Sequence, residues 1–206
     1  MLLHINPDNI DDRLINQVIK CLKNGGVIIY PTDTVYTLGC DLTHPKAYEK
    51  ICKLKNIKPN KANFSIVCSD LKHLNNFVQN LSNPCYRVMR KALPGPFTFI
   101  LNANNQVAKI FGYNKKTIGI RIPDNTICLA IVDLLESPII SASIKTDDSI
   151  LEYLTDANEI FEAYEGIVDM VIDGGLCGIE ASTVIDFTGN EPLLVREGKG
   201  DINQYL

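Results

Sequence analysis

The sequence predicts an α/β fold, a single domain over residues 1–206 in which helices cover a mixed sheet. The length of 206 residues corresponds to one domain, and the 46% of hydrophobic residues is enough for a sizeable core. Short apolar runs alternate along the chain with segments whose apolar residues recur at helical spacing. Such alternation is typical of α/β domains.

The first half of the chain begins with a predicted helix over 11–24. Its apolar residues from Ile15 to Leu22 fall at helical spacing, and Gly25-Gly26 ends it. Val27–Tyr30 is a β-branched run between Gly and Pro, typical of a strand buried on both faces. The next predicted elements are a helix from Thr43-His44-Pro45, a basic loop over 55–63, a strand over 64–68 and a helix from Asn83-Pro84 to Pro94.

The second half continues the same alternation. The predicted strands are 97–101, 117–122, 138–141, 168–172, 182–187 and 192–196, and the predicted helices are 125–135 and 156–164. A turn at Thr188-Gly189-Asn190 joins the last two strands.

Composition narrows the class of protein. The formal net charge is −4, whereas a protein that coats nucleic acid is normally basic. The seven cysteines are odd in number and show no C-x-x-C pair, so we expect buried, reduced thiols and no zinc site. The N-terminus lacks the pattern of a secretory signal, and no apolar run is long enough for a membrane span. We therefore expect a cytoplasmic location, and no contact with a membrane.

Five polar clusters lie at the ends of predicted strands, where α/β proteins commonly build their sites. The clusters are Tyr30–Gly39, Thr117–Asp124, Ile140–Ser143, Ser182–Asp186 and Val195–Gly198. The common nucleotide-binding signatures G-x-x-x-x-G-K-[ST] and G-x-G-x-x-G are missing, so a nucleotide site here would be specific to the fold.

These motifs resemble the signatures of the YrdC/YciO-like family, in the same order. Pro31-Thr32-Asp33-Thr34-Val35-Tyr36 followed by Leu38-Gly39 is similar to the first signature, and Pro94–Thr98, Thr117–Asp124 and Ser182–Asp186 to later ones. The resemblance runs from about residue 10 to the C-terminus. The Cys68–Leu71 segment and the ending from Arg196 to Asp201 are similar to the YciO branch in particular.

The resemblance implies a twisted open sheet with a deep, concave, positively lined cavity. It also implies synthesis of threonylcarbamoyl-AMP from L-threonine, bicarbonate and ATP, with release of pyrophosphate and with Mg²⁺ accompanying the nucleotide. This is the first step of threonylcarbamoyladenosine modification of tRNA. Some family members bind double-stranded RNA or tRNA, so these are possible partners. The oligomeric state does not follow from the sequence.

The resemblance assigns roles to eight residues. Thr34, Arg121, Ser141 and Ser182 match contacts to the amino-acid substrate, and Lys55, Thr117, Ser143 and Arg196 match contacts to the nucleotide, with Lys55 also catalytic. Arginine suits a carboxylate because it offers two parallel donors. Inside an apolar strand, Arg121 must either extend its charged end to solvent or pair with a carboxylate such as Asp124.

The chain departs from the pattern of the synthases at several positions. Ile57 stands where the Lys-x-Arg pair has its arginine, and Ser143 replaces the asparagine of the Ser-x-Asn pair. Cys68 replaces a histidine, and Lys145–Asp148 replaces a Ser/Gly-rich loop. Lys58 or Lys61 could supply the missing charge, though without the two-pronged geometry of arginine. We therefore expect persistent pockets and low activity.

Two other functions remain open from the sequence. One is an RNA- or nucleotide-binding relative that has lost catalysis, which the departures favour. The other is a different ligase or hydrolase on the same fold, since fold does not determine function.

Overall fold

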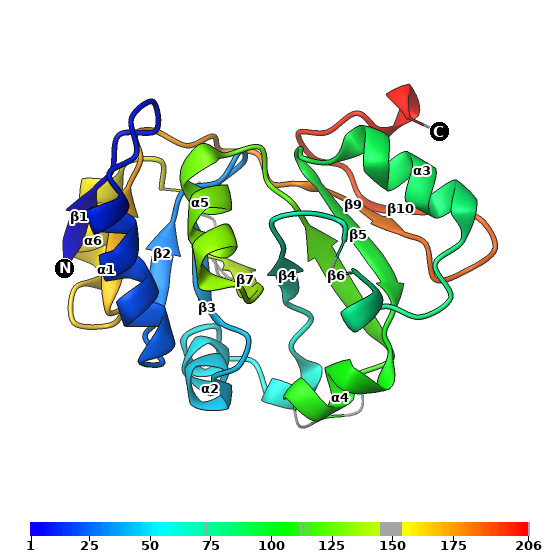
Figure 1. The fold of residues 1–206 in the computed structure, drawn as a ribbon, viewed down its shortest axis with the longest axis horizontal. Helices are drawn as coiled ribbons and strands as arrows, with labels where there is room; N and C mark the ends of the chain where they lie inside the picture. The colour runs from blue at the N-terminus through cyan, green and yellow to red at the C-terminus, as the bar shows by residue number, and fades with distance from the viewer. Residues whose placement is uncertain (73, 112, 114, 145–153, 206) are drawn as a thin grey trace.

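One mixed sheet runs through the molecule (Figure 1). The computed structural model describes residues 1–72, 74–111, 113, 115–144 and 154–205. Within these residues the strand order is β1-β8-β2-β3-β7-β4-β6-β5-β9-β10. The strands are β1 Leu2–His4, β2 Ile28–Tyr30, β3 Thr37–Asp41, β4 Ser65–Val67, β5 Phe97–Asn102, β6 Thr117–Arg121, β7 Ile139–Ser143, β8 Met170–Asp173, β9 Thr183–Asp186 and β10 Leu193–Arg196.

Helices connect most of these strands. They are α1 Asp12–Lys23, α2 Pro45–Leu54, α3 Asn83–Ala92, α4 Asn105–Phe111, α5 Thr126–Leu135 and α6 Ala157–Tyr164, with short 3₁₀ turns at Pro59–Lys61, Leu74–Asn76 and Ile202–Gln204. The side chains of Asp11, Ser82, Asn125 and Asp156 accept hydrogen bonds from the first turns of α1, α3, α5 and α6. These caps satisfy backbone donors that have no partner inside the helix.

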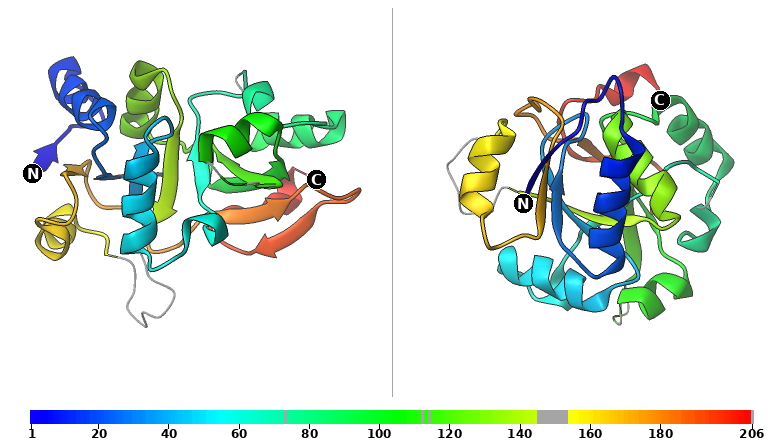
Figure 2. Two further views of the ribbon diagram at one scale, coloured as in Figure 1. Left: turned by 90° about the horizontal axis from the view of Figure 1, so that it is seen from below. Right: turned by 60° about the vertical axis from the view of Figure 1, so that its left-hand side comes forward.

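The core is divided between the two faces of the sheet. On one face α1 and α5 lie side by side over β2 and β8, and bury residues such as Ile28, Ile131 and Ile172 (Figure 2). On the other face, α2, α3, α4 and α6 contribute to a second cluster, which includes residues such as Ile66, Phe99 and Ile120. On the face that carries α1 and α5, helices therefore cover only one end of the sheet. The cavity described below lies over the uncovered part of that face.

The predicted fold class is confirmed: this is one α/β domain with a mixed, twisted, open sheet flanked by helices. The predicted helices and strands correspond to observed elements, usually within a few residues. Three elements were missed, namely β1, β3 and α4. β1 has three residues and α4 has seven, too few for a clear period. Among the described residues, no helix has the length and apolar character to cross a membrane.

Candidate functional site

The site is a cavity of about 560 Å³ over the open part of one sheet face. The hydrogen-bonding register shows how its floor is made. One row crosses the five neighbouring strands β7, β4, β6, β5 and β9 through Ser141, Ser65, Gly119, Ile100 and Asp186. Side chains opposite one another in a sheet share a face. Because three of these five residues are Gly or Ser, the floor has short side chains and leaves room above it.

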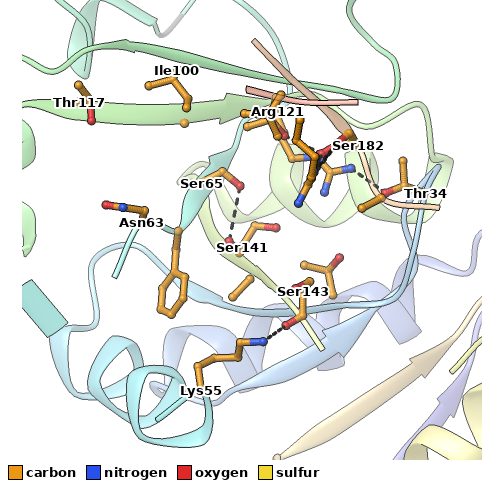
Figure 3. A pocket seen from close by; sticks show the side chains of 18 of the residues that line it. Thr34, Lys55, Asn63, Ser65, Ile100, Thr117, Arg121, Ser141, Ser143 and Ser182 are labelled. Carbon is orange, nitrogen blue, oxygen red and sulfur yellow. Dashed lines mark hydrogen bonds between the residues drawn. The ribbon is translucent and has the colours of Figure 1, made fainter. Parts of the chain in front are cut away.

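All eight residues that the sequence predicted for the site line this cavity. They are Thr34, Lys55, Thr117, Arg121, Ser141, Ser143, Ser182 and Arg196 (Figure 3). One detail of the prediction was wrong. The serine pair was expected at the end of a strand over 138–141, but β7 extends to Ser143, so Ser141 lies inside the strand. The site therefore occupies a sheet face as well as strand ends.

Arg121 is the most deeply buried cation of the site, 6% exposed at the end of β6. One of its terminal nitrogens donates to Thr34 Oγ1 at 3.0 Å and pairs with Asp33 Oδ1 at 3.3 Å. The expected partner was Asp124, close in sequence; the structure instead brings the turn after β2 against the end of β6. The reason is tertiary, since residues 88 positions apart meet here.

This pair leaves two buried polar atoms without a partner. Asp33 Oδ2 and Arg121 Nε make no hydrogen bond among the described residues. Burial raises the pKa of Asp33, and the nearby charge of Arg121 only partly opposes that shift. Lys199 holds the same turn from outside by donating to the Asp33 carbonyl at 2.5 Å. Buried polar atoms without partners are costly.

Hydroxyl groups fix the turn that carries Thr34. Thr32 Oγ1 donates to the Val35 carbonyl at 2.7 Å and lies 3.0 Å from Thr34 Oγ1. Below them, the buried Tyr30 hydroxyl donates to Ser141 Oγ at 3.3 Å. These contacts hold the hydroxyl groups of Thr34 and Ser141, which line the cavity (Figure 3).

Ser182 and Arg196 form one unit at the same end. The Arg196 guanidinium donates to the Ser182 carbonyl at 2.7 Å and to Ser182 Oγ at 3.2 Å. Ser182 Oγ also lies 2.8 Å from Thr98 Oγ1. The resemblance assigned Ser182 to the amino acid and Arg196 to the nucleotide; the geometry places the two in direct contact.

The opposite end of the cavity is basic. Lys55 Nζ, at the end of α2, donates to the Ser143 carbonyl at 3.0 Å. Lys61 and Lys115 line the same region, and so does the apolar side chain of Ile57. Lys115 donates to the Ala62 carbonyl, and burial lowers the pKa of its ammonium group.

The lining is strongly biased in charge. It includes the cations Lys55, Lys61, Lys115, Arg121 and Arg196, against one described carboxylate, Asp186. A cationic cleft with low-dielectric walls attracts anions, even in a chain whose formal net charge is −4. The sequence reading missed Lys115 and Asp186. Lys115 precedes Thr117 by two positions, and this closeness was the signal that could have found it.

Metal binding has little support from protein side chains alone. Among the described residues, no group of three or more His, Cys, Asp or Glu side chains could hold a metal ion. Asp186 is the one carboxylate among the described lining residues, and its Oδ1 accepts from the Thr188 amide at 2.7 Å.

Comparison with known proteins assigns the chain to a family. The Sua5_yciO_yrdC family profile, described as telomere recombination, matches residues 20–198. The chain belongs to the Sua5/YciO/YrdC family. The resemblance predicted from the motifs is therefore confirmed, including its similarity to YciO. The segment 145–148, where the family loop was expected to differ, lies outside the described residues.

Two members of this family show how the chain relates to its branches. The chain is 39% identical to YciO of Escherichia coli, described as uncharacterized, over 98% of both chains. The crystal structure of that YciO superposes with a TM-score of 0.90 over 100% of this chain and 99% of the other, at 38% identity. The Pyrococcus abyssi threonylcarbamoyl-AMP synthase is 28% identical over 93% of this chain and 56% of its own length.

A solved structure of a Pyrococcus abyssi Sua5 contains L-threonine. It matches this chain with a TM-score of 0.86 and 26% identity, over 96% of this chain and 57% of the other. The chain therefore corresponds to slightly more than half of these longer relatives, and to nearly all of YciO.

Proposed function

We propose that this protein activates L-threonine with ATP and bicarbonate, forming threonylcarbamoyl-AMP and pyrophosphate at a low rate. The observation that carries the proposal is the meeting of all eight predicted residues in one cationic cavity. The relatives support the choice of substrate, since more distant members are named threonylcarbamoyl-AMP synthases and one is complexed with L-threonine.

The two ends of the cavity suit the two substrates. Arg121, Thr34 and Ser141 offer a guanidinium and hydroxyls, which fit the carboxylate and hydroxyl of threonine. Lys55 at the basic end suits the phosphates, and Arg196 lies where it can contact either substrate. A volume of about 560 Å³ falls in the range of small-molecule sites.

The reaction needs two bond-forming steps. The threonine amine adds to bicarbonate with loss of water, giving a carbamate. A carbamate oxygen then attacks the α-phosphorus of ATP, and pyrophosphate leaves with the bonding electrons. The protein's contribution would be positioning and stabilisation of the charge that develops on the phosphates. Mg²⁺ would enter bound to ATP and carry part of that charge.

The departures from the synthase pattern are the reason for the low rate. Ile57 provides no charge, and Ser143 is shorter than an asparagine and lacks its paired donor and acceptor. Loss of one preorganised charge-stabilising donor reduces rates by about 10²- to 10³-fold.

The test is pyrophosphate release from ATP with L-threonine and bicarbonate, omitting each in turn. We expect slow release that requires all three, and at least about a 10²-fold loss in Arg196→Ala. Arg196 is exposed, so this change should not unfold the protein, whereas Arg121→Ala would leave Asp33 buried without its partner.

Arg87→Ala is the matched control, because Arg87 is an exposed arginine of α3 outside the cavity lining. It should retain the wild-type rate. No threonine-dependent release from folded wild-type protein would contradict the proposal. ATP binding without turnover would instead identify a nucleotide-binding relative, and RNA binding with a steep salt dependence an RNA-binding one.

A further inference from the structure

The basic end of the cavity lacks one expected cation. The family pattern places an arginine at position 57, but Ile57 lines the wall there with an apolar side chain. Its backbone is fixed, since Asn56 has the left-handed φ of 51° and the Ile57 amide donates to the Cys52 carbonyl at 2.9 Å. A triphosphate at this end would need a second cation from elsewhere.

We propose that Lys115 binds the triphosphate of ATP in place of the arginine expected at position 57. This inference rests on the proposed function. Lys115 comes from the segment before β6 (Thr117–Arg121), far from the basic loop in sequence, and lies outside the motifs that carry the family resemblance. The residue lines the same cavity as Lys55, Ile57 and Lys61.

The sheet register explains why Lys115 reaches this place. β4 and β6 run parallel with Ser65 opposite Gly119, so the segments that precede them enter the sheet at the same end. The Lys115 ammonium donates to the Ala62 carbonyl and lies 5.0 Å from the centroid of the Phe111 ring. Since an ammonium has three N–H donors, the bond to Ala62 leaves capacity for phosphate oxygens.

The surroundings of Lys115 favour an anionic ligand. Its side chain is partly buried, and this burial lowers the pKa of the ammonium group. A phosphate beside it would favour the charged form, and the attraction between the two is stronger in a desolvated wall than in water. A lysine supplies a positive charge without the two parallel donors of an arginine. This difference agrees with the low rate of the proposed reaction.

Calorimetric titration with ATP tests the inference. We expect Lys115→Ala to weaken ATP binding by about 10- to 100-fold, the usual effect of a lost hydrogen bond to a charged group. Lys116→Ala is the matched control: it removes an identical charge from the adjacent, exposed residue, which does not line the cavity. It should change ATP affinity by less than about twofold. Threonine affinity should stay unchanged in both variants, and the melting temperature of Lys116→Ala should match that of the wild type.

A rescue variant separates phosphate binding from a role in holding the loop at Ala62. Adding Ile57→Arg to Lys115→Ala should restore ATP affinity to within a few-fold of the wild type, because it returns a cation to the same region. Ile57→Arg cannot replace the hydrogen bond from Lys115 to the Ala62 carbonyl, so it would not rescue a variant that lost affinity through that contact. Failure of the rescue would therefore overturn the inference.

The remaining outcomes distinguish this inference from the proposed function. Wild-type binding of ATP that Lys115→Ala leaves intact would overturn the role of Lys115 alone. Wild-type protein that binds neither ATP nor inorganic pyrophosphate would overturn both. Lys115-dependent binding of pyrophosphate without ATP binding would support the phosphate site and overturn the proposed synthase.

Discussion

At the scale of single residues, the pair of Asp33 and Arg121 decides most about the site. Both side chains are less than 9% exposed, at 8% and 7%. Burying two charges costs free energy that their attraction only partly returns. Among the described residues, each partner also has one polar atom without a hydrogen bond. Such a cost is commonly retained where a ligand completes the hydrogen bonding.

Asp33 gives a prediction about pH. Burial raises the pKa of Asp33 above its usual 3.8, so the folded protein holds this proton more tightly than the unfolded chain does. Its stabilising contribution is complete below the unfolded pKa and is lost as pH rises through the folded pKa. Asp33→Asn removes this pH-dependent loss of stability, because asparagine does not titrate. We therefore expect the variant to gain stability relative to wild type as pH rises from about 4 to 7.

Urea unfolding of both proteins across this pH range measures the effect. The informative quantity is the difference between their free energies of unfolding, because all other titrating groups cancel in it. A difference that stayed constant, or that moved in favour of wild type with rising pH, would show that Arg121 keeps the Asp33 pKa at or below its unfolded value.

At the scale of elements, α5 shows how a local signal positions a distant site. Asn125 is the N-cap of α5, and its Oδ1 accepts a hydrogen bond from the Cys128 amide at 2.9 Å. The helix therefore begins shortly after β6, the strand that ends in Arg121. The apolar side of α5 then packs over Val67 and Ile139, next to the floor of the cavity. The cap therefore fixes where the helical cover of the sheet begins.

Asn125→Ala should lower the free energy of unfolding by about 1 kcal/mol, because the first turn of α5 loses its side-chain acceptor. Denaturant unfolding checks this value. Asn9→Ala, in an exposed turn before α1, is the control and should stay within about 0.5 kcal/mol of wild type. If the two variants proved equally stable, the cap would contribute nothing measurable.

The missed strand β3 shows the limit of local signals. Its sequence Thr-Leu-Gly-Cys-Asp has no alternation, and every residue in it is buried. Its polar residues face other elements: Asp41 accepts from the hydroxyls of Thr43 and Ser137. Gly39 is required by packing, since a Cβ there would lie 2.6 Å from the Tyr30 ring. None of these reasons is visible before the neighbouring strands are placed.

At the scale of the whole molecule, charge is distributed unevenly. The chain is acidic overall, with a formal net charge of −4, yet five cations line one cavity. An anionic ligand would therefore be drawn to this cavity and not to the general surface. The negative charge of the rest of the protein also argues against broad, nonspecific RNA binding.

This distribution predicts a difference in salt dependence between the two substrates. Raising KCl from about 0.05 to 0.5 M should weaken ATP binding by about tenfold, since salt screens the cations at the basic end. Under the proposed function, threonine is a zwitterion that the buried Arg121 would hold, so its affinity should change by less than about twofold. Titration calorimetry at both salt concentrations measures the two affinities. Equal salt dependence would show that the cationic wall does not distinguish the substrates.

The sequence by itself determined the fold class, most elements and eight of the residues that line the cavity. It could do so because apolar periodicity, helix-end signals and motifs each depend on residues that are close together in the sequence. Tertiary structure alone decided the partner of Arg121, the strand β3, the row of small residues that makes the floor, and the position of Lys115 beside the basic loop. The physical reason is shared: each depends on strand register, which brings together residues that are far apart in the chain.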